Sequence, residues 1–350
     1  MPEPTAAERI RNAWIGRVSG CMLGKPVELL SMIGGQAELD GYLDRAGAAP
    51  LRDYVPLIEG TEVERFADCC RDGLTVAVPD DDINYTVLSL MLLEEYGTGF
   101  TTDDVARAWL KWLPGGMTFT AERAAYAVLL ANASTMFPFG APPGFDLEMC
   151  SDNEFNDWIG AQIRADMYGW VAPGEPEFAA DLAARDASLS HRGEGVYGAQ
   201  AVAAIGAAIP ASPSLLAAVE TAMALLPADS DCVAAIELGA RTAVAGDGPE
   251  AIHATYEGMS PVHTVNNLAV VVWGLLRGSD DFSVAIGDTV AAGWDTDCNG
   301  ATVGGLWGLT GRSVPAHWAT PWNGRLLTSL AGVGELDLDD LVDRTLAIVP

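Results

Sequence analysis

Apolar residues recur along this chain at the spacing of helices, and the alternation typical of β-strands is almost absent. Several runs are rich in alanine and leucine, residues that form helices readily: ARAWLKWL, AERAAYAVLLANA, AVAAIGAAI and LLAAVETAMALL. The pattern therefore predicts an all-α fold. No internal repeat or change in composition marks a boundary, so we expect one compact multi-helix domain over residues 1–350.

The first predicted helix spans residues 8–25. Its apolar positions lie about four residues apart, and a second stripe at the same spacing consists of Gly16, Gly20 and Gly24. A glycine stripe predicts close packing against another helix. The helix should stop at Gly24-Lys25-Pro26 and deliver Glu28 into a loop. Residues 31–79 are rich in Gly, Asp and Pro, and this predicts loops with short helices.

Later segments carry helix start and stop signals. Thr101 and Asp104 have the spacing of a capping box before an amphipathic helix. The segment Ser190-His191-Arg192-Gly193 predicts a break between two helices. Small residues from Gly300 to Gly305 predict a helix that packs closely against neighbouring backbone.

The composition excludes some classes of partner. The 350 residues are 49% hydrophobic, enough for a large core, and 48 acidic against 19 basic residues give a formal charge of −29. Such a charge repels nucleic-acid backbones and anionic membranes, although a general composition bias is the weightier explanation of the charge itself. The six cysteines form no C-x-x-C pair, which favours reduced thiols in the cytoplasm. A signal core and an 18-residue apolar run are both absent from the sequence, which speaks against export and membrane spanning.

Two groups of aspartates are the strongest candidates for chemistry. Asp295 and Asp297 precede the glycine-containing helix, and Asp80, Asp81 and Asp82 precede another apolar helix. Aspartates at helix starts can simply cap free amides. Five carboxylates that meet in space would instead repel one another unless a cation lies between them. An all-oxygen ligand set suits Mg²⁺, Mn²⁺ or Ca²⁺ rather than zinc, and a paired metal centre suits hydrolysis.

Two glycine-containing turns are weaker candidates for ligand binding. Gly115 and Gly116 lie in a loop before a helix, where free amides can bind phosphate, although most such loops are plain turns. His191 lies in a turn with Gly193, where a structural role is at least as common as ligand contact.

Several motifs together resemble the ADP-ribosylglycohydrolase family, and they follow the family's order over nearly the whole chain. They are RIRNAWIGRVSGCMLGKPVE, PDDDINYTVL, WIGAQIRADMYGWVAPGEPEFAADLAARDASLSH, HTVNNLAVVVWGLL and GWDTDCNGATVGG. The resemblance implies a compact all-α domain with a centre of two magnesium, or manganese, ions. It also implies hydrolysis of the bond between ribose C1″ of ADP-ribose and a protein side chain or small leaving group.

The resemblance also implies roles for individual residues. The expected metal ligands are Asp80, Asp81, Asp82, Asp295, Asp297 and Cys298, and the expected catalytic residues are Glu28, Asp81 and Asp297. The expected substrate-binding residues are Gly115, Gly116, Thr118, His191 and Gly193. In two places the chain departs from the family's pattern. Asp80 replaces a neutral threonine, and Cys298 replaces a hydroxyl ligand, where a thiol binds Mg²⁺ poorly.

Three alternatives remain open at this stage. The substrate could be a smaller ribosyl metabolite or nucleoside. The chain could bind ADP-ribose without catalysis because its ligands are altered. It could also be a structural, Ca²⁺-stabilised helical protein, which would melt in a metal-dependent way without responding to nucleotide.

Overall fold

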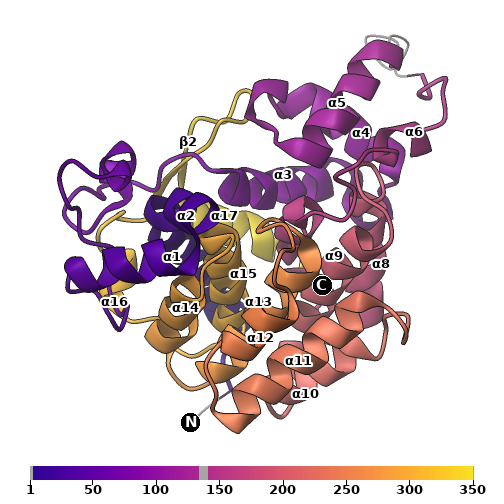
Figure 1. Cartoon of the computed structure of the whole chain (residues 1–350). Helices are drawn as coiled ribbons and strands as arrows, with labels where there is room; N and C mark the ends of the chain where they lie inside the picture. Colours follow the sequence, from indigo (N-terminus) through magenta and orange to yellow (C-terminus); the bar gives the residue numbers. More distant parts are fainter. Residues whose placement is uncertain (1–2, 134–140, 350) are drawn as a thin grey trace.

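Two helices that are far apart in the sequence pack against each other at the centre of the molecule (Figure 1). The computed structural model describes residues 3–133 and 141–349. Helices α1 (Ala6–Gly24) and α15 (Thr296–Gly308) lie side by side. A Cβ atom on Gly16 would lie 2.0 Å from the carbonyl oxygen of Gly304, and one on Gly20 would lie 1.9 Å from that of Gly300. Only glycine fits at such a contact, so the close packing predicted for both helices is confirmed.

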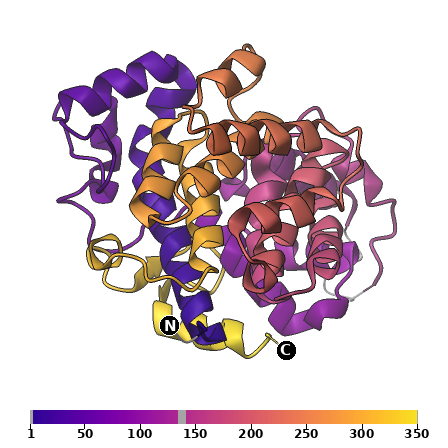
Figure 2. The same ribbon diagram turned by 90° about the horizontal axis from the view of Figure 1, so that it is seen from below.

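Further helices surround this pair (Figure 2). The apolar side chains of the pair are buried in the core. Helices α13 and α14 pack against α15, α11 packs against α13, and α9 contacts α7, α8 and α10. Their bounds are α7 (Asp166–Trp170), α8 (Pro176–Ala187), α9 (Glu194–Ala208), α10 (Leu215–Met223), α11 (Asp231–Ala245), α13 (Thr264–Arg277) and α14 (Phe282–Ala291). The described residues thus form an all-α domain, as predicted.

Three consecutive helices cover one side of the centre: α3 (Asp81–Tyr96), α4 (Thr102–Trp112) and α5 (Thr120–Asn132). The predicted capping box of α4 is present, because the Asp104 carboxylate accepts from the Thr101 amide at 2.8 Å. The predicted break before α9 is also present, since α8 ends at Ala187 and α9 begins at Glu194.

The segment after α1 is more helical than the sequence predicts. A 3₁₀ turn, η1 (Lys25–Val27), leads directly into α2 (Glu28–Arg45). The prediction of loops from residue 31 is therefore wrong up to residue 45, and Glu28 is the first residue of a helix. The pattern is hidden because Gly35 bends the helix at a φ of 72° and only a few of its residues are buried. Residues 46–79 are irregular apart from η2 (Glu62–Cys69), as predicted.

The remaining elements are short or peripheral. Two strands, β1 (Arg325–Leu327) and β2 (Glu335–Asp337), pair antiparallel with Arg325 opposite Asp337, and α17 (Leu338–Leu346) packs on α1. The others are η3 (Gly97–Gly99), η4 (Gly115–Met117), α6 (Glu148–Ser151), η5 (Ile159–Arg164), η6 (Ile209–Ala211), α12 (Glu250–Thr255) and α16 (Ala316–Ala319). Within residues 3–133 and 141–349, no helix combines the length and apolarity that crossing a membrane requires.

Candidate active site

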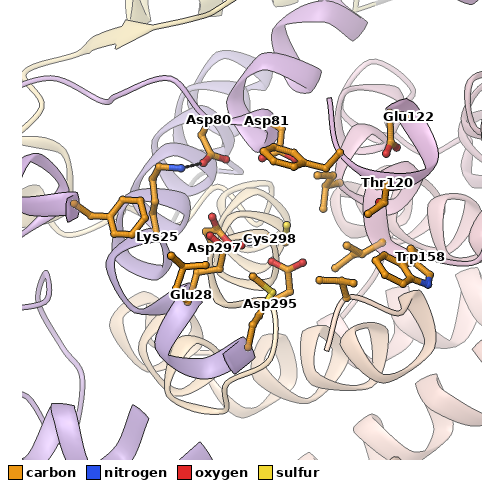
Figure 3. A pocket seen from close by; sticks show the side chains of 18 residues that line it. Lys25, Glu28, Asp80, Asp81, Thr120, Glu122, Trp158, Asp295, Asp297 and Cys298 are labelled. Atoms are coloured by element: carbon orange, nitrogen blue, oxygen red, sulfur yellow. Dashed lines mark hydrogen bonds and ion pairs between the residues drawn. The ribbon is translucent and has the colours of Figure 1, made fainter. Parts of the chain in front are cut away.

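A cavity of about 400 Å³ lies where α1 ends and where α2, α3 and α15 begin (Figure 3). Six carboxylates line it, contributed by the starts of four helices: Glu28, Asp80, Asp81, Glu122, Asp295 and Asp297. Members of both aspartate groups predicted from the sequence therefore line one cavity, although Asp82 is not among them.

Asp80 caps helix α3 and binds a lysine. Its backbone is extended, and its Oδ1 accepts from the Asp82 amide at 2.9 Å. Its Oδ2 forms an ion pair with Lys25. Burial alone would raise the pKa of Asp80, but Lys25 and the Asp82 amide together hold it below its ordinary value. Both oxygens thus have partners within the protein, so the N-cap interpretation explains this aspartate.

The next two aspartates have different surroundings. Asp82 is fully buried, and its Oδ1 accepts from the Arg17 guanidinium at 2.9 Å, while its Oδ2 has no hydrogen-bond partner among the described residues. Asp81 faces the cavity (Figure 3). Burial, followed by the negative charges of Asp80 and Asp297, raises the pKa of Asp81 well above its ordinary value. Asp81 is therefore the aspartate of this group that is open to a ligand.

The start of α15 is fixed by contacts with α1 and α13. The Thr296 hydroxyl donates to the carbonyl oxygen of Gly24 at 2.8 Å. The Asp295 amide donates to Asn267 Oδ1, which also accepts from Asn299 Nδ2 at 2.7 Å. Trp294, just before this turn, has a positive φ of 56°, an uncommon conformation for a bulky residue. These contacts direct the following aspartates into the cavity.

The carboxylate of Asp295 does not cap its helix. It makes no capping hydrogen bond, and its Oδ1 is buried without a partner among the described residues. Asp297 Oδ1 accepts from the Cys298 amide at 3.0 Å. Burial and the charge of Asp297 raise the pKa of Asp295 well above its ordinary value. Burying a charged carboxylate without a partner is strongly unfavourable unless a proton or a cation binds to it.

Glu28 completes an all-carboxylate group. Its ligand oxygen, one of Asp295 and one of Asp297 lie within 4.8 Å of one another. Burial, then the charges of Asp297 and Asp295, raise the pKa of Glu28 well above its ordinary value. Carboxylate oxygens are the donors that Mg²⁺ and Mn²⁺ prefer, and the unpaired Oδ1 of Asp295 is available to bind one. These three residues therefore fit a hard divalent ion.

Two other groups of ligand atoms contain a thiol. The first consists of Asp82, Asp297 and Cys298, and the second consists of Cys21, Asp80 and Asp82. Burial is the main cause that raises the pKa of the Cys298 thiol, with Asp295 adding to it. A neutral thiol is a poor ligand for Mg²⁺. The predicted role of Cys298 as a ligand gains no support from this chemistry.

The predicted phosphate loop lies beside the cavity. Gly115 and Gly116 form η4 and Thr118 follows it, but these three are not among the residues that line the cavity. The next two residues, Phe119 and Thr120, do line it. Contact of the glycines and Thr118 with substrate stays a prediction.

His191 lies behind the cavity wall. Its side chain is buried, its Nδ1 is 2.8 Å from the Ser190 hydroxyl, and its Nε2 is 3.8 Å from Oε1 of Glu122. Burial and the nearby Arg164 lower the pKa of His191 well below its ordinary value, so the ring is neutral. Gly193, at the N-cap of α9, adopts a φ of 47° and does not line the cavity. Glu122 thus separates His191 from the cavity, and substrate contact by His191 and Gly193 stays a prediction.

Sequence reasoning missed the basic residues of this site. Lys25 and Arg17 pair with Asp80 and Asp82, and Arg164 holds Glu122 at 2.5 Å and Asp186 at 3.3 Å. For Lys25 a signal existed, because it lies three residues before Glu28 and so within the same short turn. For Arg164 the only signal in the sequence was its place in the WIGAQIRAD motif.

Comparisons with known proteins agree with this architecture. A family model described as ADP-ribosylglycohydrolase matches residues 2–347. A search of the curated proteins found no match. A solved structure titled "ADP-ribosylglycohydrolase-related protein complex" has a TM-score of 0.54 and 19% identity, over 97% of this chain and 98% of that chain. This likeness concerns the fold alone. Because the family model covers nearly the whole chain, this protein belongs to the ADP-ribosylglycohydrolase family.

Proposed function

We propose that the protein hydrolyses the glycosidic bond at ribose C1″ of an ADP-ribose conjugate, with Mg²⁺ or Mn²⁺ as the cofactor. The ADP-ribose would be attached to a protein side chain or to a small leaving group. The observation that carries the proposal is the group of Glu28, Asp295 and Asp297, whose oxygens lie within 4.8 Å of one another in a cavity. Membership of a glycosyl hydrolase family supports the reaction class.

The carboxylates divide the work of this reaction. Glu28, Asp295 and Asp297 would hold the divalent ion, which would place positive charge beside the ribose hydroxyls and lower the pKa of bound water. Glu28, at the beginning of α2, accepts the proton of the attacking water. As the bond at C1″ breaks, its electron pair goes to the leaving group, which takes up a proton from solvent. Asp81 and Asp297 stabilise the positive charge that develops on the ribose until the water oxygen bonds to C1″.

One part of the cavity lining suits a flat, apolar group. Phe119, Trp158, Ile159 and Val262 are among the lining residues, and in Figure 3 Trp158 lies on the side away from Lys25. Aromatic rings of this kind stack on planar groups such as a nucleobase. This wall would hold the part of the substrate remote from the reacting carbon.

A smaller ribosyl compound without phosphate is the second candidate substrate. Among the described residues that line the cavity, Lys25 is the only lysine or arginine, and its ammonium already pairs with Asp80. A diphosphate would therefore meet carboxylates without a free basic side chain to bind it. This lack of a free basic side chain among the described lining residues is the observation that speaks for a nucleoside-like substrate, whereas the family match speaks for the ADP-ribose conjugate proposed first.

The experiment is a hydrolysis screen with and without Mg²⁺ or Mn²⁺. Its substrates are arginine-, serine- and O-acetyl-linked ADP-ribose and simple nucleosides. Metal-dependent release from one of them supports the proposal and identifies the substrate class. Binding of ADP-ribose, measured by thermal shift, without any hydrolysis would instead indicate a catalytically silent member. The Asp280→Asn variant is a suitable control for charge, because this side chain is 87% exposed and does not line the cavity.

The thiols and the net charge suggest where the protein works. All six cysteines are unpaired and buried. Since free thiols persist in reducing compartments, we place the protein in the cytoplasm. Its formal charge of −29 speaks against nucleic acid as a partner.

A further inference from the structure

The chain contains two lysines, and one of them lies in the acidic cavity. Lys111 is at the surface, where it pairs with Glu95 at 2.5 Å. Lys25 lines the cavity and pairs with Asp80, and its side chain is 18% exposed. The other basic residues of the chain are arginines. Lys25 therefore places a compact positive charge in the cavity where a divalent ion is expected.

The Lys25 ammonium lies between negative groups. Figure 3 shows its nitrogen directed at Asp80, with Asp297 beside it. Both carboxylates act electrostatically on Lys25. The Phe66 ring lies 5.8 Å from the nitrogen, close enough for a cation–π contact that fixes the side chain further.

A second basic residue neutralises the neighbouring aspartate. Arg17 is fully buried and contacts Asp82 and Asp166, each at 2.9 Å. Of the three aspartates at the start of α3, Asp80 and Asp82 thus already have basic partners. Asp81 has no ion pair within the described residues.

These pairings distinguish the three groups of ligand atoms. The group of Cys21, Asp80 and Asp82 has both carboxylates paired and a thiol as its third member. In the group of Asp82, Asp297 and Cys298, Asp82 is paired and Cys298 is again a thiol. Across the described ranges, only the group of Glu28, Asp295 and Asp297 consists of three carboxylates without a basic side chain in an ion pair.

We propose that the Lys25 ammonium takes the place of one cation on the Asp80 side of this centre, so that the protein binds a single divalent ion. That ion binds to Glu28, Asp295 and Asp297. The inference rests on the proposed function for the presence of a divalent ion, and it concerns the number of ions. It revises the pair of ions implied by the family resemblance, and it explains why a charged Asp80 is tolerated where the family has a neutral threonine.

The test counts Mn²⁺ ions bound by the full-length protein. Isothermal titration calorimetry gives the stoichiometry, and electron paramagnetic resonance distinguishes an isolated Mn²⁺ from a coupled pair. We expect one isolated Mn²⁺ per chain. The Lys25→Met variant, which keeps the aliphatic stem but removes the charge, should bind two. Lys25→Arg should keep the count at one, and so should the matched control Lys111→Met.

Two results would overturn the inference. One is a pair of Mn²⁺ ions bound to the unaltered protein, which decides the matter even if Lys25→Met does not fold. The other is a single ion bound to a Lys25→Met variant whose circular dichroism shows that it is folded. If the unaltered protein binds no divalent ion, the proposed metal-dependent function fails as well. A pair of ions, by contrast, leaves that function intact.

Discussion

Replacing Asp297 with asparagine should stabilise the metal-free protein and remove the stabilisation that a divalent ion provides. Asp297 belongs to two of the three groups of ligand atoms, and it is the carboxylate closest to the middle of the centre in Figure 3. Asparagine has nearly the same shape, and its Oδ1 can still accept from the Cys298 amide. The variant therefore changes charge while it preserves the local hydrogen bond.

The expected size of the effect follows from the distances. Two unit charges 4.8 Å apart repel each other by about 3.5 kcal/mol at an effective dielectric constant of about 20. The raised pKa values of Glu28 and Asp295 indicate that bound protons relieve part of this repulsion. We therefore expect the metal-free variant to gain only about 1–2 kcal/mol.

These free energies correspond to measurable changes in melting temperature. For a chain of 350 residues, an unfolding entropy of about 2.1 cal/mol/K per residue makes 1 kcal/mol equal to about 1.4 °C. The metal-free variant should then melt about 1–3 °C higher than the unaltered protein. Mg²⁺ at about 100 times its Kd should stabilise the unaltered protein by about 2.7 kcal/mol, or about 4 °C.

Differential scanning calorimetry with and without Mg²⁺ measures both effects, and a turnover assay on the substrate from the screen accompanies it. Turnover of Asp297→Asn should fall about 100-fold or more, as expected when a strong electrostatic contribution is lost. Asp280→Asn should leave the response to Mg²⁺ unchanged. The reasoning is refuted if Asp297→Asn melts below the unaltered protein without metal, or if Mg²⁺ stabilises both to the same extent.

Three further predictions concern pH, the helix contact and the cavity wall. Burial raises the pKa values of Glu28, Asp81 and Asp295, so the folded metal-free protein holds protons that the unfolded chain releases. The stability of the metal-free protein should therefore fall as pH rises from the ordinary carboxylate pKa of about 4 through the raised pKa values, and melting curves over pH check this. Mg²⁺ affinity should increase with pH over the same range, which Mg²⁺ titrations check. Gly304→Ala should lower the unfolding free energy by about 1–3 kcal/mol or more, because its Cβ would lie 2.0 Å from the Gly16 carbonyl oxygen. Denaturant unfolding measures this change, with Gly99→Ala as the control because Gly99 has open space around it. Glu122→Gln should weaken its contact with Arg164 and cost about 1–3 kcal/mol of stability, and an unchanged midpoint in urea would contradict this.

The helices that pack by local rules could be predicted from the sequence. The glycine stripe of α1 and the small residues of α15 predicted a close contact. In the structure the two backbones lie so close that a Cβ on Gly16 or Gly20 would clash with a carbonyl oxygen of α15. Helix α2 was missed because its stability does not depend on a continuous apolar face. It is bent at Gly35, and few of its side chains are buried. A helix that is stabilised by the rest of the fold, rather than by its own apolar periodicity, is hard to recognise in a single sequence.

The site could be predicted in part. Two acidic groups at helix starts suggested that Asp81 and Asp297 would meet, and they line one cavity. The partners of each carboxylate could not be predicted, because they come from distant segments. Arg17, for example, contacts Asp82 and Asp166, which are 65 and 149 residues away in the sequence. The burial of His191 behind Glu122 is likewise a product of packing that no local pattern records.

The Asp80–Lys25 pair compensates the negative charge that Asp80 adds at a position where the family's pattern has a neutral threonine. An aspartate buried at the start of α3 adds a negative charge to a cavity that five other carboxylates already line. Left unpaired, such a charge would be costly, and removing either partner of a buried pair leaves the other uncompensated. Lys25 lies at the end of α1, where the glycine contact with α15 holds it beside Asp297 as well. The same helix packing that assembles the carboxylates therefore also positions the basic residue that limits how many cations they need.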